Sequence, residues 1–178
     1  IYTSYQEYLD HQKEKLEHLD LSEYDARYRH VLRARLQKIG RLQRGTSVLC
    51  LGARIGTEVK AFLDLGCFAV GIDVNPGRDN QYVVYGDFHV IQFASSSVDV
   101  VFTNCLDHVL DLNTVIEEIG RVMKPDGLLI VEAVKGSCEG EVPHQYESYW
   151  WSHIDDLLNQ FQNSGFRLVG RHSFEYPW

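Results

Sequence analysis

Apolar residues along this chain recur with two different spacings, one typical of buried strands and the other of helices with a single buried face. Short apolar or alternating runs predict six strands, at residues 47–51, 68–72, 82–85, 98–103, 128–133 and 166–174. Apolar residues three or four positions apart predict five helices, at 5 to about 19, 22 to near 40, 57–65, 112–123 and 152–163.

The order of these elements indicates the fold class. Two helices come first, with Ser4 and Glu7 spaced as a capping box, and strands then alternate with helices. Such alternation predicts an α/β fold in which a parallel sheet has helices on both faces, joined by right-handed crossovers. The 178 residues, 44% of them hydrophobic, are enough for one domain spanning 1–178, with helices in 1–40 and a core in 45–178.

Charge and cysteine usage limit the partners. A formal net charge of −8 disfavours binding to nucleic acid or to an anionic membrane. No apolar stretch approaches 18 residues, and the start does not resemble a signal peptide. The four cysteines form no C-x-x-C pair and no cluster with histidine at metal-binding spacing. We therefore expect a cytoplasmic protein that holds no metal, while its oligomeric state stays open.

One segment departs from the acidic composition. Residues 27–44 contain seven of the seventeen basic residues and no acidic residue. This segment is either a patch that attracts an anionic ligand or the solvated face of an amphipathic helix. Apolar residues at helical spacing on the opposite side favour the second interpretation.

The most informative motif lies where the first predicted strand ends. Gly52 and Gly56 follow the strand, a helix begins at once, and the next strand ends in Asp73, 21 residues after Gly52. Glycine lets the backbone approach a ligand closely, and a helix N-terminus favours an anionic group. An acid at the tip of the second strand can accept hydrogen bonds from both ribose hydroxyls. The layout predicts a site for a nucleotide-type cofactor.

The glycine spacing decides between cofactors. A dinucleotide fingerprint needs glycine at the first, third and sixth positions, and Arg54 and Thr57 occupy two of these. The segments LGARIGTEV, VGIDV, GDFHVIQF and VFTNCLDHV resemble the class I S-adenosylmethionine-dependent methyltransferases, and the broad methyltransferase type 11 group in particular. The resemblance covers roughly residues 45–135 and, more weakly, the remainder.

This resemblance implies a Rossmann-like, doubly wound and mostly parallel sheet of six or seven strands with an N-terminal helical lid. The family sheet ends in an antiparallel hairpin, of which only the first strand is expected before Trp178. The implied cofactor is S-adenosylmethionine, and the residues implied to bind it are Gly52, Ala53, Arg54, Gly56, Asp73, Val74, Gly86, Asp87, Phe88 and Asn104.

Two positions depart from the family pattern. Cys50 stands where the group usually has an acid, and Arg54 where it usually has a glycine. Arg54 can pair with the cofactor carboxylate through a charge-assisted hydrogen bond, point to solvent, or mark a site that no longer binds the cofactor.

The resemblance implies that Asp87 bonds the adenine amino group and that Phe88 packs on the adenine ring. It also implies that the backbone near Asn104 contacts the amino group at the methionine end of the cofactor. Alternatively, Asp87 only caps a loop and Phe88 belongs to the core. Asp107 and His108 come next and are the candidate catalytic pair, or else a helix-entry acid and a surface histidine. Asp99 is interpreted as structural.

Three functions remain after this comparison. The first is methyl transfer to a small-molecule acceptor, with His108 as proton acceptor if the nucleophile must lose a proton. Tyr146, Tyr149 and Trp150 either enclose that acceptor or anchor the last helix. The second is a methyltransferase-like binding domain without catalysis, and the third is a nicotinamide-dependent enzyme. The acceptor itself cannot be read from the sequence.

Overall fold

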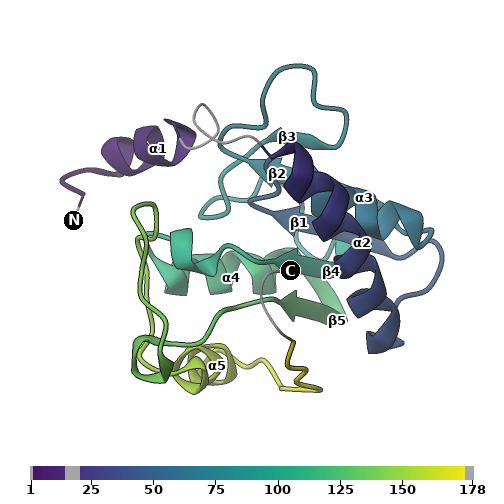
Figure 1. The fold of residues 1–178 in the computed structure, drawn as a ribbon. Helices are drawn as coiled ribbons and strands as arrows, with labels where there is room; N and C mark the ends of the chain where they lie inside the picture. The colour runs from purple at the N-terminus through teal and green to yellow at the C-terminus, as the bar shows by residue number, and fades with distance from the viewer. Residues whose placement is uncertain (1, 15–20, 175–178) are drawn as a thin grey trace.

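A five-stranded parallel sheet forms the centre of the computed structural model, which describes residues 2–14 and 21–174 (Figure 1). The strands lie in the order β3-β2-β1-β4-β5. Their bounds are Ser47–Leu51 for β1, Phe68–Asp73 for β2, Val83–Tyr85 for β3, Val98–Thr103 for β4 and Met123–Val131 for β5. The order reverses direction at β1, so the carboxyl ends of β1, β2 and β4 border the crevice where such sheets bind ligands.

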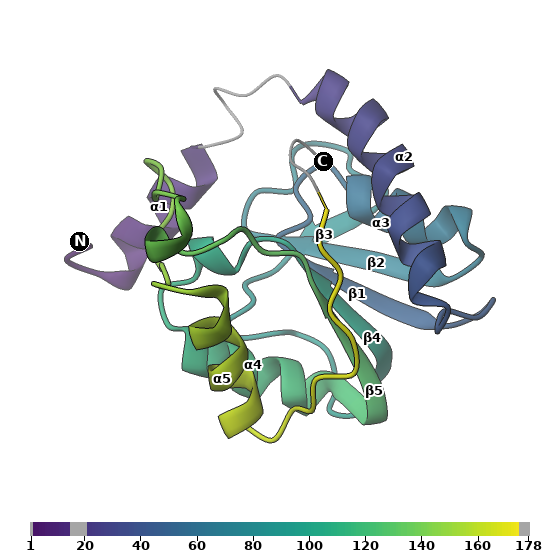
Figure 2. The same cartoon turned by 60° about the horizontal axis from the view of Figure 1, so that its bottom comes forward.

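Helices cover the two faces of the sheet (Figure 2). The helices are α1 (Tyr5–Glu14), α2 (Ser22–Ile39), α3 (Thr57–Asp64), α4 (Leu112–Val122) and α5 (Ile154–Asn163), with short 3-10 turns η2 (Leu106–His108) and η3 (Ser137–Glu139). Val48 and Cys50 of β1 pack with α2 and α3, whereas Leu49 and Leu51 pack with α4 and α5. Successive strand residues thus reach opposite faces, as the period of two requires.

The prediction of six or seven strands is wrong for the described residues, which form five. The expected strand 166–174 pairs with no other strand, and Leu168 and Val169 are both about half exposed. In a strand, Gly170 and His172 would lie on the same face as Leu168, so this segment has no continuously apolar face. Without such a face, no pairing register with a neighbouring strand is favoured. The first helix is confirmed to Glu14, and its expected continuation over 15–19 lies outside the described residues.

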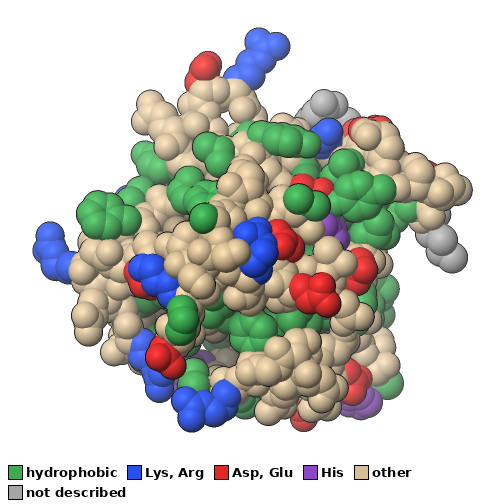
Figure 3. All heavy atoms as spheres, turned by 180° about the vertical axis from the view of Figure 1, so that it is seen from behind, with side chains coloured by type: hydrophobic (Ala, Val, Ile, Leu, Met, Phe, Trp, Pro, Cys, Tyr) green, Lys and Arg blue, Asp and Glu red, His purple; other side chains and the backbone are tan. Residues whose placement is uncertain are grey.

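Three of the seven basic residues in segment 27–44, including Arg29 and Arg35, form ion pairs with acidic residues that the structure describes. Arg29 contacts Asp64 at 2.6 Å, and Arg35 contacts Glu132 at 3.1 Å. Figure 3 shows the face opposite to the view of Figure 1, and there too Lys and Arg side chains lie among Asp and Glu side chains rather than in one patch. These contacts agree with the interpretation of an ordinary charged helix face.

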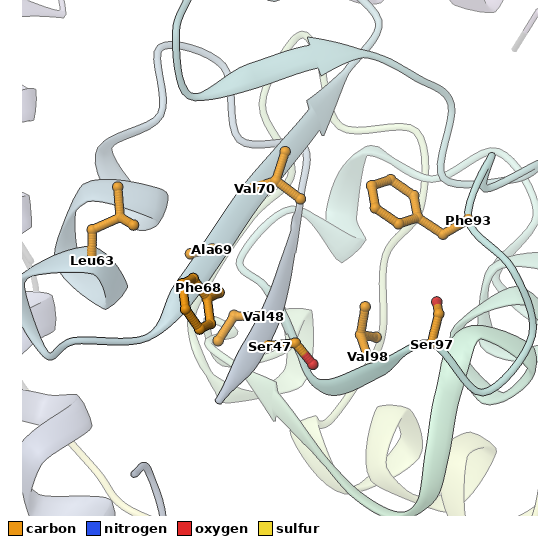
Figure 4. Close-up of a pocket in the computed structure, with 9 residues that line it drawn as sticks. All are labelled: Ser47, Val48, Leu63, Phe68, Ala69, Val70, Phe93, Ser97 and Val98. Carbon is orange, nitrogen blue, oxygen red and sulfur yellow. The ribbon is translucent and has the colours of Figure 1, made fainter. Parts of the chain in front are cut away.

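The amino ends of the strands border an open pocket of about 390 Å³. It lies between α3 and the loop before β4 and is lined by Ser47, Val48, Leu63, Phe68, Ala69, Val70, Phe93, Ser97 and Val98 (Figure 4). The pocket is therefore at the opposite edge of the sheet from the predicted cofactor site. No helix within 2–14 and 21–174 is both long and apolar enough to cross a bilayer.

Asp99 joins β4 to β1, as the structural interpretation of this residue predicts. Its carboxylate accepts hydrogen bonds from Ser47 N at 2.9 Å and Ser47 Oγ at 2.6 Å, and from Lys124 Nζ at 2.7 Å. The bonds from Lys124 and Ser47 lower the pKa of Asp99 to about 2. The ionised carboxylate is therefore the form that the fold stabilises.

We expect the Asp99→Asn variant to be less stable than the wild type at neutral pH, with the difference disappearing in acid. The pKa of Asp99 is lower in the folded state than in the unfolded chain, so its stabilisation is present above about pH 4 and is lost as the pH falls toward the folded value. Urea unfolding of both proteins between pH 7 and pH 2.5 measures this. A constant difference across that range would show that the charge of Asp99 is not the cause.

Candidate functional site

The loop between β1 and α3 has a backbone shape that depends on glycine. Gly52 has a φ of 62° and Gly56 a φ of 84°, and Arg54 between them also has a positive φ of 44°. A Cβ on Gly52 would lie 2.4 Å from the Cys105 Sγ atom, and one on Gly56 would lie 2.6 Å from the Tyr82 Cβ atom. Both positions therefore exclude larger residues through backbone strain and through close neighbours.

Three further predicted cofactor residues lie along this loop and the next strands. Ala53 is buried, and its N–H donates to Ile72 O at 3.1 Å. Gly86 is buried beside the Gln92 amide and donates to Asp73 O at 3.0 Å, and Val74 follows β2 in a partly buried position. Ala53 and Gly86 thus have packing roles, and cofactor contact by these three residues stays a prediction.

Asp73 ends β2 directly beside the glycine loop. Its Oδ2 atom accepts a hydrogen bond from Arg54 N at 2.9 Å, and its Oδ1 atom accepts one from Asn75 N at 2.8 Å. The side chain therefore ties the loop after β1 to the loop after β2. Each carboxylate oxygen can accept more than one hydrogen bond, so this geometry is compatible with the predicted contact to ribose hydroxyls.

Asp87 holds a network that was not expected from the sequence. Its Oδ1 atom accepts from His89 N at 2.8 Å and from His89 Nδ1 at 2.9 Å, and its Oδ2 atom accepts from the Tyr5 hydroxyl of α1. Burial would raise the pKa of Asp87, but the bonds from His89 and Tyr5 outweigh burial and lower this pKa. Phe88 packs against the core and also faces Gly52, so both of its proposed roles remain compatible with the structure.

His89 connects this network to the loop after β4. Its Nε2 atom accepts hydrogen bonds from Leu110 N at 3.1 Å and Asp111 N at 3.3 Å, so its proton is on Nδ1, which donates to Asp87. His89 is 5% exposed. Sequence reasoning missed it because a lone histidine after Asp-Phe carries no signal about a partner more than twenty positions away.

A buried polar cluster, which we define as Tyr24, Tyr28, Glu58 and Asn104, lies at the carboxyl end of β4. The Asn104 amide donates to Glu58 Oε1 at 3.1 Å and to the Tyr28 hydroxyl at 3.0 Å, and the Tyr24 hydroxyl donates to Glu58 Oε1 at 3.2 Å. The cluster therefore joins α2, α3 and β4 at the predicted site.

Three members of the cluster were missed from the sequence. In the sequence, Tyr24 and Tyr28 belong to the apolar stripe of α2, and Glu58 is explained by the preference for acidic residues in the first turn of a helix. The structure instead makes Glu58 only 2% exposed. Burial raises the pKa of Glu58, and the nearby charge of Arg54 opposes that rise.

The Arg54 side chain enters the same region. Its guanidinium carbon lies 5.2 Å from the centre of the Tyr24 ring, and the guanidinium donates no hydrogen bond to any residue that the structure describes. Burial would lower the pKa of Arg54, but Tyr24, Glu58, Cys105 and Asp73 nearby raise it. Arg54 is therefore a partly buried cation that can still donate hydrogen bonds to a ligand.

Asp107 and His108, the predicted catalytic pair, lie together in η2. His108 Nδ1 is 2.7 Å from the Tyr146 backbone carbonyl, which can only accept, so Nδ1 carries the proton. His108 Nε2 lies 3.8 Å from Asp107 Oδ1, and both side chains are partly buried. This arrangement leaves Nε2 as the basic nitrogen and places a carboxylate beside it.

Helix α1 contacts several loops around the predicted site. The Tyr8 hydroxyl donates to His108 O at 2.8 Å, the Gln12 amide donates to Tyr146 O at 2.8 Å, and Lys13 O accepts from the Asn75 amide at 2.7 Å. Figure 2 shows α1 beside the yellow-green loop that follows β5. Closure of this helix over a ligand, as a lid, stays a prediction.

The aromatic residues after β5 divide between two roles. Tyr149 accepts a hydrogen bond from the Gln160 amide at 2.6 Å, and Trp150 stacks on Trp151, whose ring lies in the core. These contacts anchor the loop to α5 and the sheet. Tyr146 instead stacks on His11 of α1, with ring centres 4.8 Å apart, close to His108.

Known structures share this fold. A SAM-dependent methyltransferase from Aquifex aeolicus is 19% identical with a TM-score of 0.66, covering 85% of this chain and 88% of that one. Phosphoethanolamine N-methyltransferase 2 of Haemonchus contortus, solved with S-adenosylhomocysteine, is 18% identical with a TM-score of 0.68, covering 89% of this chain and 44% of that one.

A third similar chain comes from the complex between the Haloferax volcanii Trm112 methyltransferase activator and a methyltransferase. It is 23% identical with a TM-score of 0.63, and the match covers 81% of this chain and 73% of that one. Independently of these structures, residues 49–131 match the family described as a methyltransferase domain. That segment runs from β1 to the end of β5 and includes the glycine loop, Asp73, Asn104 and His108. Residues 49–131 are thus similar to the methyltransferase domain family, and the solved methyltransferase structures share the fold of this chain.

Proposed function

We propose that this protein transfers a methyl group from S-adenosylmethionine to a small organic acceptor. The observation that carries the proposal is Arg54, a partly buried guanidinium without a hydrogen-bond acceptor among the described residues, in a loop that requires glycine at positions 52 and 56. A buried cation of this kind is stabilised by an anionic ligand group. The carboxylate of S-adenosylmethionine is such a group.

The residues at the carboxyl ends of the strands fit the rest of this cofactor. Gly52 leaves the backbone bare where a Cβ would collide with Cys105, and Asp73 lies at the tip of β2 for the ribose. Asp87, Phe88 and Asn104 lie at the ends of β3 and β4, where the family places adenine and the amino group. The proposal accommodates the departures at Cys50 and Arg54, because Cys50 is buried within β1 and Arg54 would supply a hydrogen-bond donor to the cofactor.

When bound, S-adenosylmethionine supplies a methyl group on a positively charged sulfur. The chain itself would hold the acceptor atom close to that methyl group and in line with it, which is the main source of acceleration in such a displacement. His108 Nε2 would accept the proton that a hydroxyl or ammonium acceptor must lose. Asp107 would then stabilise the imidazolium, while the Tyr146 carbonyl holds Nδ1–H and fixes the ring orientation.

A small acceptor agrees with the surroundings of His108. Its backbone carbonyl accepts from Tyr8 of α1 and its ring contacts the Tyr146 carbonyl, and the similar Haemonchus contortus enzyme was solved with phosphomonomethylethanolamine, a small amine. The net charge of −8 argues against a nucleic acid substrate. Four free cysteines favour a reducing compartment such as the cytoplasm.

Titration calorimetry with S-adenosylhomocysteine tests the proposal. We expect binding with a dissociation constant between about 1 μM and 1 mM, the usual range for enzyme ligands. NADH, titrated in the same buffer, should give no binding heat because the glycine spacing does not fit a dinucleotide. Absence of S-adenosylhomocysteine binding at millimolar concentration would overturn the enzyme assignment and favour a methyltransferase-like binding domain.

A further inference from the structure

Glu58 is a buried carboxylate that forms no ion pair with any residue within 2–14 and 21–174. It is 2% exposed, and the two hydrogen bonds that it accepts from other described residues, Tyr24 and Asn104, reach the Oε1 atom. Arg54 is close enough to affect its pKa, yet no ion pair within 4.0 Å joins the two side chains among the described residues. A buried charge is costly unless a cation or enough donors compensate it.

We propose that Glu58 binds the ammonium group of the cofactor's amino acid end, an inference that rests on the proposed function. Glu58 and Arg54 would then form a charge-selective pair, with the carboxylate of the ligand on Arg54 and its ammonium group on Glu58. A zwitterionic ligand would satisfy both residues, because its carboxylate is attracted to Arg54 and its ammonium group to Glu58. A ligand with only one charged group would leave either Arg54 or Glu58 without a counter-charge.

The geometry supports this assignment at each position. Glu58 lies in the first turn of α3, and Arg54 lies in the loop just before this helix, close enough for its charge to act on Glu58. Asn104, which the family places beside the amino group, donates directly to Glu58 Oε1 and fixes the carboxylate. Tyr24 contacts both charged groups, since its hydroxyl donates to Glu58 and its ring lies under the Arg54 guanidinium.

Cofactor analogues with one charge each separate the two roles. The probes are S-adenosylhomocysteine, its decarboxylated analogue with only the ammonium group, its deaminated analogue with only the carboxylate, and 5′-methylthioadenosine with neither. Calorimetry should show that Glu58→Gln weakens S-adenosylhomocysteine and the decarboxylated analogue by about 10- to 100-fold, the range for hydrogen bonds between charged groups. The deaminated analogue should bind this variant as it binds the wild type.

Arg54→Met should give the opposite pattern, with weaker binding of the deaminated analogue and unchanged binding of the decarboxylated one. Glu132→Gln is the matched control because Glu132 also accepts a hydrogen bond from an α2 tyrosine, at 2.6 Å, but is already paired with Arg35. We expect it to bind all four probes as the wild type does. Equal losses for both analogues in Glu58→Gln would show a general disturbance of the site and overturn the proposal.

A measurement on the wild type avoids any question of folding. If Glu58 binds the ammonium group, the decarboxylated analogue should bind about 10-fold or more tightly than 5′-methylthioadenosine. Equal affinity for these two ligands would overturn the assignment of Glu58. Absence of binding for all four ligands would instead contradict the proposed function, so the two failures are distinguishable.

Discussion

Replacing Gly52 by alanine should destabilise the protein and abolish detectable binding of S-adenosylhomocysteine. The new Cβ would lie 2.4 Å from the Cys105 Sγ atom and 3.2 Å from its Cβ atom, at a residue with a φ of 62°. Backbone strain at such a φ and overpacking each cost about 1–3 kcal/mol. Thermal unfolding and calorimetry of the purified variant measure the two effects.

Two comparisons separate strain from collision. Gly77 has a φ of 77°, and a Cβ on it would meet no atom within 4 Å, so Gly77→Ala should show only the strain. In Gly52→Ala/Cys105→Ala the sulfur is absent, and the double variant should recover part of the stability lost by Gly52→Ala. If the stability changes of Gly52→Ala and Cys105→Ala simply add in the double variant, contact with Cys105 is not the reason for glycine at position 52.

The glycine loop and the strands that flank it could be predicted because their signals are local. Strands 47–51 and 98–103 are confirmed at both ends, since each apolar run is bounded by polar residues or glycine. Gly52 and Asp73 lie where the spacing predicts, at the carboxyl ends of two adjacent strands, and Gly56 caps α3. Here the sequence pattern and the backbone geometry depend on the same few residues.

The side-chain network around this loop could not be predicted, because its partners are far apart in the sequence. The Tyr28 hydroxyl donates to Glu132, 104 positions away, and the Tyr5 hydroxyl reaches Asp87 across 82 positions. No periodicity relates such residues; only the packing of α1 and α2 against the sheet brings them together. The incorrect strand at 166–174 has a related cause, since pairing depends on a neighbouring edge and not on alternation alone.

Asp87 shows how contacts between residues far apart in the sequence change the interpretation of a functional site. From the sequence, Asp87 is expected either to bind adenine or to cap a loop. The structure shows a third role, in which the Asp87 carboxylate joins α1 to His89. His89 in turn holds the loop that carries His108. Any ligand group that bonds Asp87 therefore competes with, or adds to, contacts that position α1 and the candidate catalytic loop.

The second large effect is expected for Asp73→Asn, which should weaken S-adenosylhomocysteine binding by about 10²- to 10⁴-fold. Two ribose hydroxyls bonded to one carboxylate account for this range, at about 1.5–3 kcal/mol for each bond to a charged acceptor. The carboxylate also accepts from Arg54 N and Asn75 N, so its loss should loosen the loop as well. Calorimetry gives the affinity, and urea unfolding gives the change in stability.

A ligand without ribose hydroxyls separates direct contact from loosening of the loop. The wild type should bind the 2′,3′-dideoxy analogue of S-adenosylhomocysteine much more weakly than the parent compound, whereas Asp73→Asn should bind both alike. Asp99→Asn is the matched control, because Asp99 also accepts a backbone N–H from β1, at the opposite edge of the sheet, and its loss should leave affinity unchanged. If Asp73→Asn still discriminates between the two ligands as the wild type does, Asp73 acts through the loop and another group holds the ribose.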